Sequence, residues 1–211
     1  RLDYNPSQRD QFFLRYSMSG RTDVRPAPLP GLANGGDSST GNGFEDTKGA
    51  SLGYTRAFTP RTINEVRVGF NYVHVRRGVP PNGTSFPPPE LQVPGAPNDP
   101  RVNGLTLFSP SGYRRVGDPR FAPTILASQE RQVNDVLTLV RGPHTLKLGG
   151  EIRWSQFNIS QEAAPRGQFS FSGQFTGSSL ADMLVGLPSR ANISTVIEMG
   201  NRQHVPALFA Q

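Results

Sequence analysis

Short turns and long loops alternate along this chain, and this alternation restricts the possible folds more than any other feature of the sequence. Strand-like segments meet through tight turns at Thr59–Thr62 and Arg141–His144, where Pro and Gly favour a reversal of the backbone. Other segments are separated by two connections rich in Pro and Gly, residues 20–49 and 76–131. Loops longer than about 15 residues are uncommon in compact domains. We therefore expect an antiparallel sheet with its short turns at one end and its long loops at the other.

The strand-like segments have apolar residues at every second position, which is the period of a half-buried strand. In residues 64–75, one face carries Val66, Val68, Phe70 and Tyr72. The same alternation predicts further strands at 11–19, 50–58, 133–140, 144–157 and 167–173. The opposite faces carry polar and charged residues, among them Glu65, Arg67, Asn71, Lys147, Glu151 and Arg153.

Two classes of all-β protein fit this pattern. Outer-membrane β-barrels have short periplasmic turns, long extracellular loops, an apolar face toward lipid and a polar face toward the lumen. Their strands need about 9–11 residues to cross the bilayer, and the segments 63–75 and 144–157 are at least that long. A soluble extracellular β-sandwich that binds polysaccharide would show the same alternation. The unequal connections favour the first class, an antiparallel transmembrane β-barrel segment of about five to seven strands.

The expected strands are too few to close a barrel, because single-chain barrels have roughly 8 strands or more. The chain begins at Arg1 without Met and ends on VPALFAQ, which looks like the first part of a further strand. We therefore expect residues 1–211 to be part of one outer-membrane β-barrel domain that is truncated at both ends.

Several residues on the apolar faces bear on the membrane interpretation. Interfacial aromatic girdles and ordinary cross-strand packing explain the aromatic ones equally well. The candidates for an interfacial position are Tyr54, Tyr72, His74 and Trp154. Arg56 and Asp135 also fall on the apolar faces and count against a lipid-facing surface, although Arg56 is near enough to a turn for its side chain to reach water.

The sequence offers no group of residues typical of an enzyme. It has no Cys, which excludes disulfides, thiolate zinc sites and cysteine nucleophiles. His74, His144 and His204 lack metal-ligand spacing, and no phosphate-binding or hydrolase motif is present. The net charge of +6 comes from scattered Arg residues, so we expect a solvated surface and no nucleic-acid partner. We predict no catalytic, metal-binding or cofactor-binding residues.

The long connections contain two further features. The segment SSLADMLVGLPS predicts a short amphipathic helix near 178–186, with Leu180, Met183 and Leu184 on one side, folded onto the barrel mouth or rim. Asx residues in NDP (98–100) and GDP (117–119) suit turns better than Ca²⁺ ligation. A ligand would bind in the long loops. Aromatic residues there could stack on a ligand, but we favour a role as packing anchors for Phe86, Phe108, Tyr113 and Phe121.

Four stretches of the chain resemble the β-barrel of TonB-dependent outer-membrane receptors, in particular the Oar-like group with a carboxypeptidase-regulatory-like N-terminal domain. These stretches are RLDYNPSQRDQFFLRYSMS, LGYTRAFTPRTINEVRVGFNY, VNDVLTLVRGPHTLKLGGEIRW and GQFSFSGQFTGSSLADMLVGLPS. Together they cover most of the chain except the Pro-rich loops.

The resemblance implies a location in the outer membrane of a Gram-negative bacterium, contact with outer-membrane lipid, and a barrel of about 22 strands around a plug. In that family the plug couples to the TonB–ExbB–ExbD system, which energises uptake of an extracellular ligand. Neither a plug nor the N-terminal domain is recognisable in these residues, and no residue identifies the ligand. Some Oar-like proteins are linked to adhesion, so a non-transporting adhesion or structural barrel is the alternative function.

Overall fold

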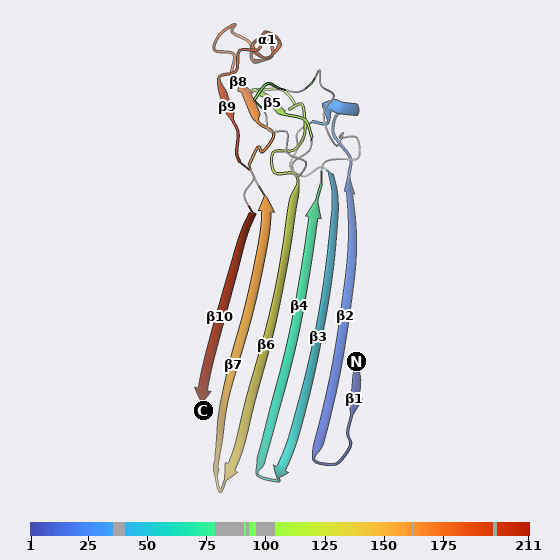
Figure 1. Cartoon of the computed structure of the whole chain (residues 1–211), viewed down its shortest axis with the longest axis vertical. Coiled ribbons are helices and arrows are strands. Elements are labelled where there is room, and N and C mark those ends of the chain that lie inside the picture. The colour runs from blue at the N-terminus through green and yellow to red at the C-terminus, as the bar shows by residue number, and fades with distance from the viewer. Residues whose placement is uncertain (36–40, 79–90, 92, 96–103, 162, 196–197) are drawn as a thin grey trace.

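The structure is a computed structural model that describes all residues except 36–40, 79–90, 92, 96–103, 162 and 196–197. Its main element is an antiparallel sheet of seven strands in the order β1-β2-β3-β4-β6-β7-β10 (Figure 1). The strands are β1 Leu2–Tyr4, β2 Asp10–Arg25, β3 Gly41–Thr59, β4 Thr62–Arg77, β6 Thr124–Arg141, β7 His144–Gln161 and β10 Glu198–Ala210. The sheet is open, with β1 and β10 at its edges, and the predicted antiparallel all-β architecture is confirmed.

The short turns lie at one end of this sheet and the long connections at the other, as the alternation predicts (Figure 1). Only Pro60 and Arg61 separate β3 from β4, and only Gly142 and Pro143 separate β6 from β7. Gly142 has a φ of 55°, a conformation that Gly adopts without steric cost.

The predicted limits of the long loops, 20–49 and 76–131, are wrong. β2 and β3 remain paired up to Arg25 and Gly41, and β4 and β6 remain paired up to Arg77 and Thr124. The upper parts of these strands contain Gly and charged residues, which resemble loop sequence. The ladder nevertheless continues, because its hydrogen bonds join backbone groups that every one of these residues has. The connections therefore span only 26–40 and 78–123.

The strand expected at 167–173 is not part of the large sheet. β8 (Gln168–Phe171) pairs in parallel with β5 (Leu107–Pro110) and antiparallel with β9 (Arg190–Asn192), forming a small second sheet. With only four residues, β8 is much too short to cross a bilayer. Described residues of three long connections, those after β2, β4 and β7, meet in this region, and we call residues 26–35, 104–123 and 163–195 the cap. Residues 26–35 include a short 3₁₀ helix, η1 (Gly31–Ala33).

The predicted helix is present as α1 (Ser179–Leu184), but its position and its buried face differ from expectation. It contacts β5 and β8 of the cap and lies at the outer tip, away from the rim of the large sheet (Figure 1). Its buried residues are Ser179 and Asp182, whereas Leu184 is 76% exposed. The polar side faces inward because Asp182 accepts hydrogen bonds from the loop that precedes the helix.

The buried apolar side chains of the described residues all belong to the cap: Leu105, Leu107, Ala122, Ala164 and Phe171. In the large sheet, by contrast, many apolar side chains are exposed, including Met18 at 75% and Leu208 at 90%. Soluble proteins rarely expose apolar patches of this extent, and such patches mark contact with a membrane or a partner.

Candidate functional site

The pairing register assigns each strand residue to one of two faces, because directly paired residues point to the same side of a sheet. Phe12, Tyr54 and Val66 are paired across β2, β3 and β4 and define the apolar face. Phe13 and Gly53, one position along, define the polar face.

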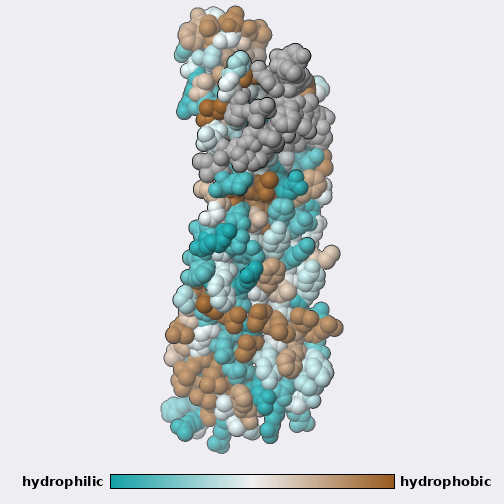
Figure 2. Space-filling model, viewed as in Figure 1, coloured by the Kyte–Doolittle hydropathy of each residue, from teal (hydrophilic) through white to brown (hydrophobic). Residues whose placement is uncertain are grey.

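An uninterrupted row of apolar residues crosses the apolar face on all seven strands. Its members are paired in order from β1 to β10 as Leu2, Leu14, Leu52, Val68, Val133, Ile152 and Pro206. We call the apolar zone around this row the belt. Figure 2 shows a hydrophobic zone across the lower part of the molecule, with hydrophilic residues below it at the turns and above it on the strands. In the described part of the chain, no second sheet covers the apolar face, so a β-sandwich does not account for it.

The height of the belt matches the hydrocarbon layer of an outer membrane. On the apolar face of β4, the polar residues that flank the belt are Asn64 and His74, ten residues apart. At about 3.3 Å per residue and a tilt of 35–45°, ten residues rise about 25 Å. The apolar band of outer-membrane barrels is about 25 Å tall.

The belt also runs obliquely across the strands, as it must where strands tilt relative to a membrane. The cross-strand row of Phe12, which is the lower limit of the belt on β2, reaches β7 at Gly150. On β7, however, the lower limit of the belt is Leu146, four residues below Gly150. β2 and β7 are four strand steps apart, so the shift is one residue per strand. One residue of about 3.3 Å against a strand spacing of about 4.8 Å corresponds to a tilt of about 35°. The upper limit, from Met18 to Trp154, shifts by two residues in the same direction.

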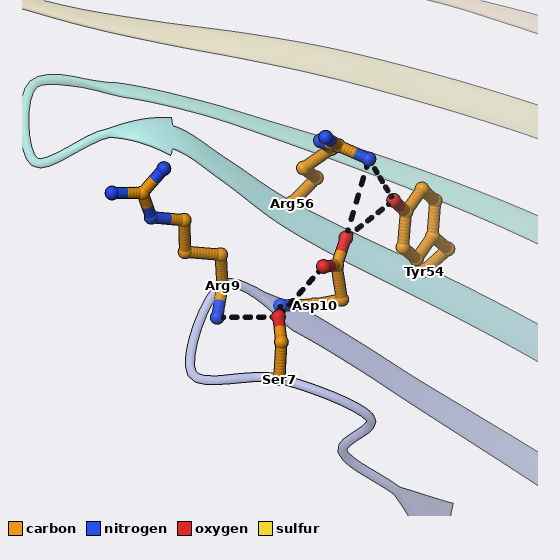
Figure 3. A network of polar contacts seen from close by, with 5 residues as sticks. All are labelled: Ser7, Arg9, Asp10, Tyr54 and Arg56. Carbon is orange, nitrogen blue, oxygen red and sulfur yellow. Dashed lines mark hydrogen bonds and ion pairs between the residues drawn. The ribbon is translucent and has the colours of Figure 1, made fainter.

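A polar network closes the lower edge of the belt (Figure 3). The Tyr54 hydroxyl donates to Asp10 Oδ1 at 2.7 Å, and the Ser7 hydroxyl donates to Asp10 Oδ2 at 2.7 Å. Arg56 lies 3.5 Å from the same carboxylate. Arg56 therefore belongs to the rim of the belt rather than to its interior, which removes one objection to a lipid-facing surface.

The other candidate interfacial residues lie at the upper edge of the belt. Tyr72 and Trp154 are its last apolar-face aromatics on β4 and β7, and His74 follows two residues above Tyr72. Cross-strand packing also occurs, because the rings of Phe12 and Tyr54 stack with centroids 4.4 Å apart. Asp135 does interrupt the belt, and it accepts a hydrogen bond from Asn64 at 2.5 Å.

The polar face carries charges that are largely balanced. Arg67 pairs with Glu65, and Arg153 pairs with Glu151 at 2.9 Å. Both of these pairs lie within a single strand. The cross-strand contact is between Arg153 and Glu130, at 3.9 Å. Such a surface suits a polar lumen.

Two glycines on the polar face are covered by aromatic rings. A Cβ on Gly53 would lie 2.0 Å from the Phe13 ring, and a Cβ on Gly149 would lie 2.4 Å from the Phe209 ring. Phe13 and Phe209 are the directly paired residues on the neighbouring strands. Each Phe therefore occupies the space that a side chain would fill, which fixes the register at that pair.

In the cap, Asp118 joins two of the long connections. Its Oδ1 accepts from Asn34 Nδ2, and its Oδ2 accepts from the backbone N–H of Leu105 at 2.6 Å. Its side chain is fully buried. The Asp of the GDP segment is thus a buried structural acceptor, while the NDP segment at 98–100 lies outside the described residues.

Arg166 brings in the third connection. Its guanidinium donates to the carbonyls of Ala122 at 2.5 Å, Pro119 at 2.6 Å and Leu105 at 3.3 Å. Only 5% of the residue is exposed. Burial lowers the pKa of Arg166, and the Asp118 carboxylate partly opposes this shift. Arg166 and Asp118 together hold segments from three connections in one structure.

The loop aromatics differ in their packing, and the histidines do not lie in a metal-binding cluster of the described residues. Phe108 stacks on Phe169 and Phe171, with centroids 5.8 and 6.4 Å apart, so the expected anchoring role holds for it. Tyr113 is exposed, the Phe121 ring packs under Arg120, and Phe86 lies outside the described residues. The described part of the chain contains no cluster of His and acidic side chains that could hold a metal ion.

A protein-family model for an outer membrane beta barrel domain matches residues 1–211. The chain belongs to this outer membrane beta-barrel family. Searches of curated proteins and of solved structures gave no significant match. Within the described residues, no helix is long and apolar enough to cross a membrane.

Membership in this family indicates an outer-membrane location, and the general properties of such barrels suggest what each face and each end of the sheet contacts. In outer-membrane beta barrels the apolar face contacts lipid, the polar face lines the lumen, short turns are periplasmic and long loops are extracellular. By this general arrangement the belt is the proposed lipid-facing surface, and the cap is at the end of the sheet proposed to be extracellular.

Sequence reasoning misses the buried residues of the cap, above all Asn34, Asp118 and Arg166. They lie in Pro- and Gly-rich stretches without periodicity, so no pattern identifies them. A usable signal is Gly117, which has a φ of 99° and whose Cβ would lie 2.0 Å from the Thr106 carbonyl oxygen. It marks a close backbone contact beside Asp118.

Proposed function

We propose that this chain is a section of the barrel of a TonB-dependent receptor, in which the cap helps to bind an extracellular ligand and a plug couples its uptake to the TonB–ExbB–ExbD system, which energises it. The proposal draws on the four stretches that resemble Oar-like receptors. The observation that supports it best is the height of the strands. β3 has 19 residues, whereas about 9–11 suffice to cross the bilayer.

At a tilt of about 40°, 19 residues rise about 48 Å, roughly twice the height of the belt. The strands thus carry the cap well above the membrane, where it is accessible to bulky ligands. The cap is itself a folded unit with buried Asp118 and Arg166, so its loops are fixed on a rigid scaffold, where binding residues are commonly found.

The test uses the full-length protein purified from outer membranes and the periplasmic domain of TonB from the same bacterium. We expect binding in isothermal titration calorimetry, with loss of binding when the segment N-terminal to the plug is deleted. Absence of binding at concentrations of tens of micromolar, from protein that shows heat-modifiable gel mobility, would refute energised uptake while leaving the barrel intact.

A non-transporting adhesion barrel is the second candidate, and one observation favours it. The tip of the cap exposes the apolar residues Phe175, Leu184, Val185 and Leu187. Cells that carry the full-length protein should then aggregate, and a Leu184→Ser/Val185→Ser variant should aggregate less. Equal sedimentation of both strains and of a deletion strain would exclude this function.

A further inference from the structure

We propose that the upper edge of the belt carries a binding site for the phosphorylated headgroups of outer-leaflet lipid, formed by Arg131, Trp154, Arg202 and His204. The proposal depends on the barrel and not on energised uptake. The four residues lie on the lipid-facing side of β6, β7 and β10, since Arg131, Trp154 and His204 are directly paired across these strands. Arg202 lies two residues above His204 in the same face.

These side chains surround a groove of about 560 Å³ that opens on the lipid-facing side. Its floor and walls include Phe70, Val133 and Trp154, and its polar lining includes Arg131, Arg202 and His204. An apolar floor next to guanidinium groups suits a molecule with acyl chains and an anionic head.

The charge of this groove is not balanced by the described residues around it. Arg131 donates to Gln129 at 3.3 Å, and Arg202 donates to Asn158 at 2.9 Å and to the carbonyl of Asn201 at 2.9 Å. Among the described residues, no carboxylate forms an ion pair with either guanidinium. On the polar face, in contrast, Arg67 and Arg153 both pair with glutamates.

The height of the groove agrees with the level of lipid headgroups. On β6 the residues that flank the belt are Arg141 below and Arg131 above, ten residues apart, which repeats the spacing of Asn64 and His74 on β4. Arg131 is directly paired with Trp154, the upper limit of the belt on β7, and with Phe70, two residues below Tyr72 on β4, so it lies near the upper edge of the belt. Trp154, its direct neighbour, has the amphipathic ring that is enriched at this level. Guanidinium groups bind phosphate through two parallel hydrogen bonds, and the pair is charge-assisted.

The experiment measures lipid binding to the full-length protein in a neutral detergent by native mass spectrometry. The probes are bisphosphorylated lipid A and its dephosphorylated form, which share their acyl chains. We expect the phosphorylated form to bind at least about tenfold more tightly, and an Arg131→Gln/Arg202→Gln variant to lose that preference. The matched control is Arg61→Gln/Arg141→Gln, which removes two arginines at the periplasmic turns and should retain it.

Equal binding of the two lipids would overturn the proposal, as would an unchanged preference in the Arg131→Gln/Arg202→Gln variant. Displacement of the lipid by an equal concentration of inorganic phosphate would identify a site for free phosphate instead of a lipid site. If the Arg131→Gln/Arg202→Gln variant lacks heat-modifiable mobility, the salt dependence of lipid binding to the wild-type protein tests the proposal instead. The wild-type preference should fall severalfold between about 0.05 and 0.5 M ammonium acetate, a volatile salt that native mass spectrometry tolerates, and a salt-independent preference would contradict the proposal.

Discussion

Replacement of Val68 by Arg tests the assignment of the belt to the lipid side. Val68 lies in the all-apolar row between Leu52 and Val133, and it is one residue from the midpoint between Asn64 and His74. An arginine at the bilayer midplane of a barrel costs about 2–4 kcal/mol. We therefore expect Val68→Arg to lower the free energy of unfolding of the full-length protein by about that amount.

The matched control is Asn71→Arg, which adds the same side chain to the same strand but on the polar face. Asn71 is exposed and directly paired with Glu130, so the new charge faces water and a carboxylate. We expect a change within about 1 kcal/mol. Guanidinium unfolding of protein inserted in phospholipid vesicles, followed by Trp fluorescence, gives both values. Equal losses in the two variants, or a larger loss for Asn71→Arg, would refute the assignment of the faces.

Three further predictions concern the polar face and the cap. Gly53→Ala should destabilise the full-length barrel by about 1–3 kcal/mol in the same assay, because the Phe13 ring must move. A second substitution, Phe13→Ala, should relieve most of this strain. An unfolding midpoint unaffected by Gly53→Ala would contradict the role of this pair. Asp118→Leu should leave the Asn34 amide and the Leu105 N–H without their buried acceptor and remove a carboxylate that favours the charged form of Arg166. We expect this to weaken the cap by about 3–5 kcal/mol, so proteolysis should become faster in the cap while heat-modifiable mobility remains. Burial raises the pKa of Asp182, but hydrogen bonds from Thr176, Phe175 and Gly173 outweigh this effect and lower the pKa below the ordinary 3.8. Docking of α1 should therefore be stable above pH 3.8 and weaken as the pH falls below it. Hydrogen exchange in 173–187 should show this pH dependence, and Asp182→Asn should abolish it.

The large sheet was predictable from the sequence because its information is local and periodic. Alternation at Val66, Val68, Phe70 and Tyr72 defines a strand and its faces, and Pro60 with Arg61 defines the turn before it. The upper halves of the strands were not predictable in this way. Above the belt both faces can contact water, so side chains there no longer alternate, although the backbone ladder continues.

The cap could not be predicted because its contacts join residues that are distant in the sequence. Asn34 and Asp118 are 84 residues apart, and Leu105 and Arg166 are 61 apart. β8 illustrates the resulting error: its alternating Phe169 and Phe171 predict a strand correctly, but nothing in the segment identifies β5 as its partner. The inward position of Asp182 on α1 was not predictable for a different reason: its hydrogen-bond donors are only six and seven residues away, but they lie in a loop without periodicity.

The different locations of the belt and of the buried side chains imply an order of assembly. The buried apolar side chains of the described residues lie in the cap and not in the large sheet. The cap segments, however, are brought together only when the strands between them have paired. Closing loops of this length before the strands pair carries an entropic cost without compensating contacts. We expect the cap to become resistant to protease only after the barrel acquires heat-modifiable mobility, and resistance that came earlier would contradict this order. Once formed, the contacts of Asp118 and Arg166 join the three connections to one another. A strand that slipped by one residue would turn its apolar side chains toward the lumen. It would also displace its connection, so that these contacts could not form.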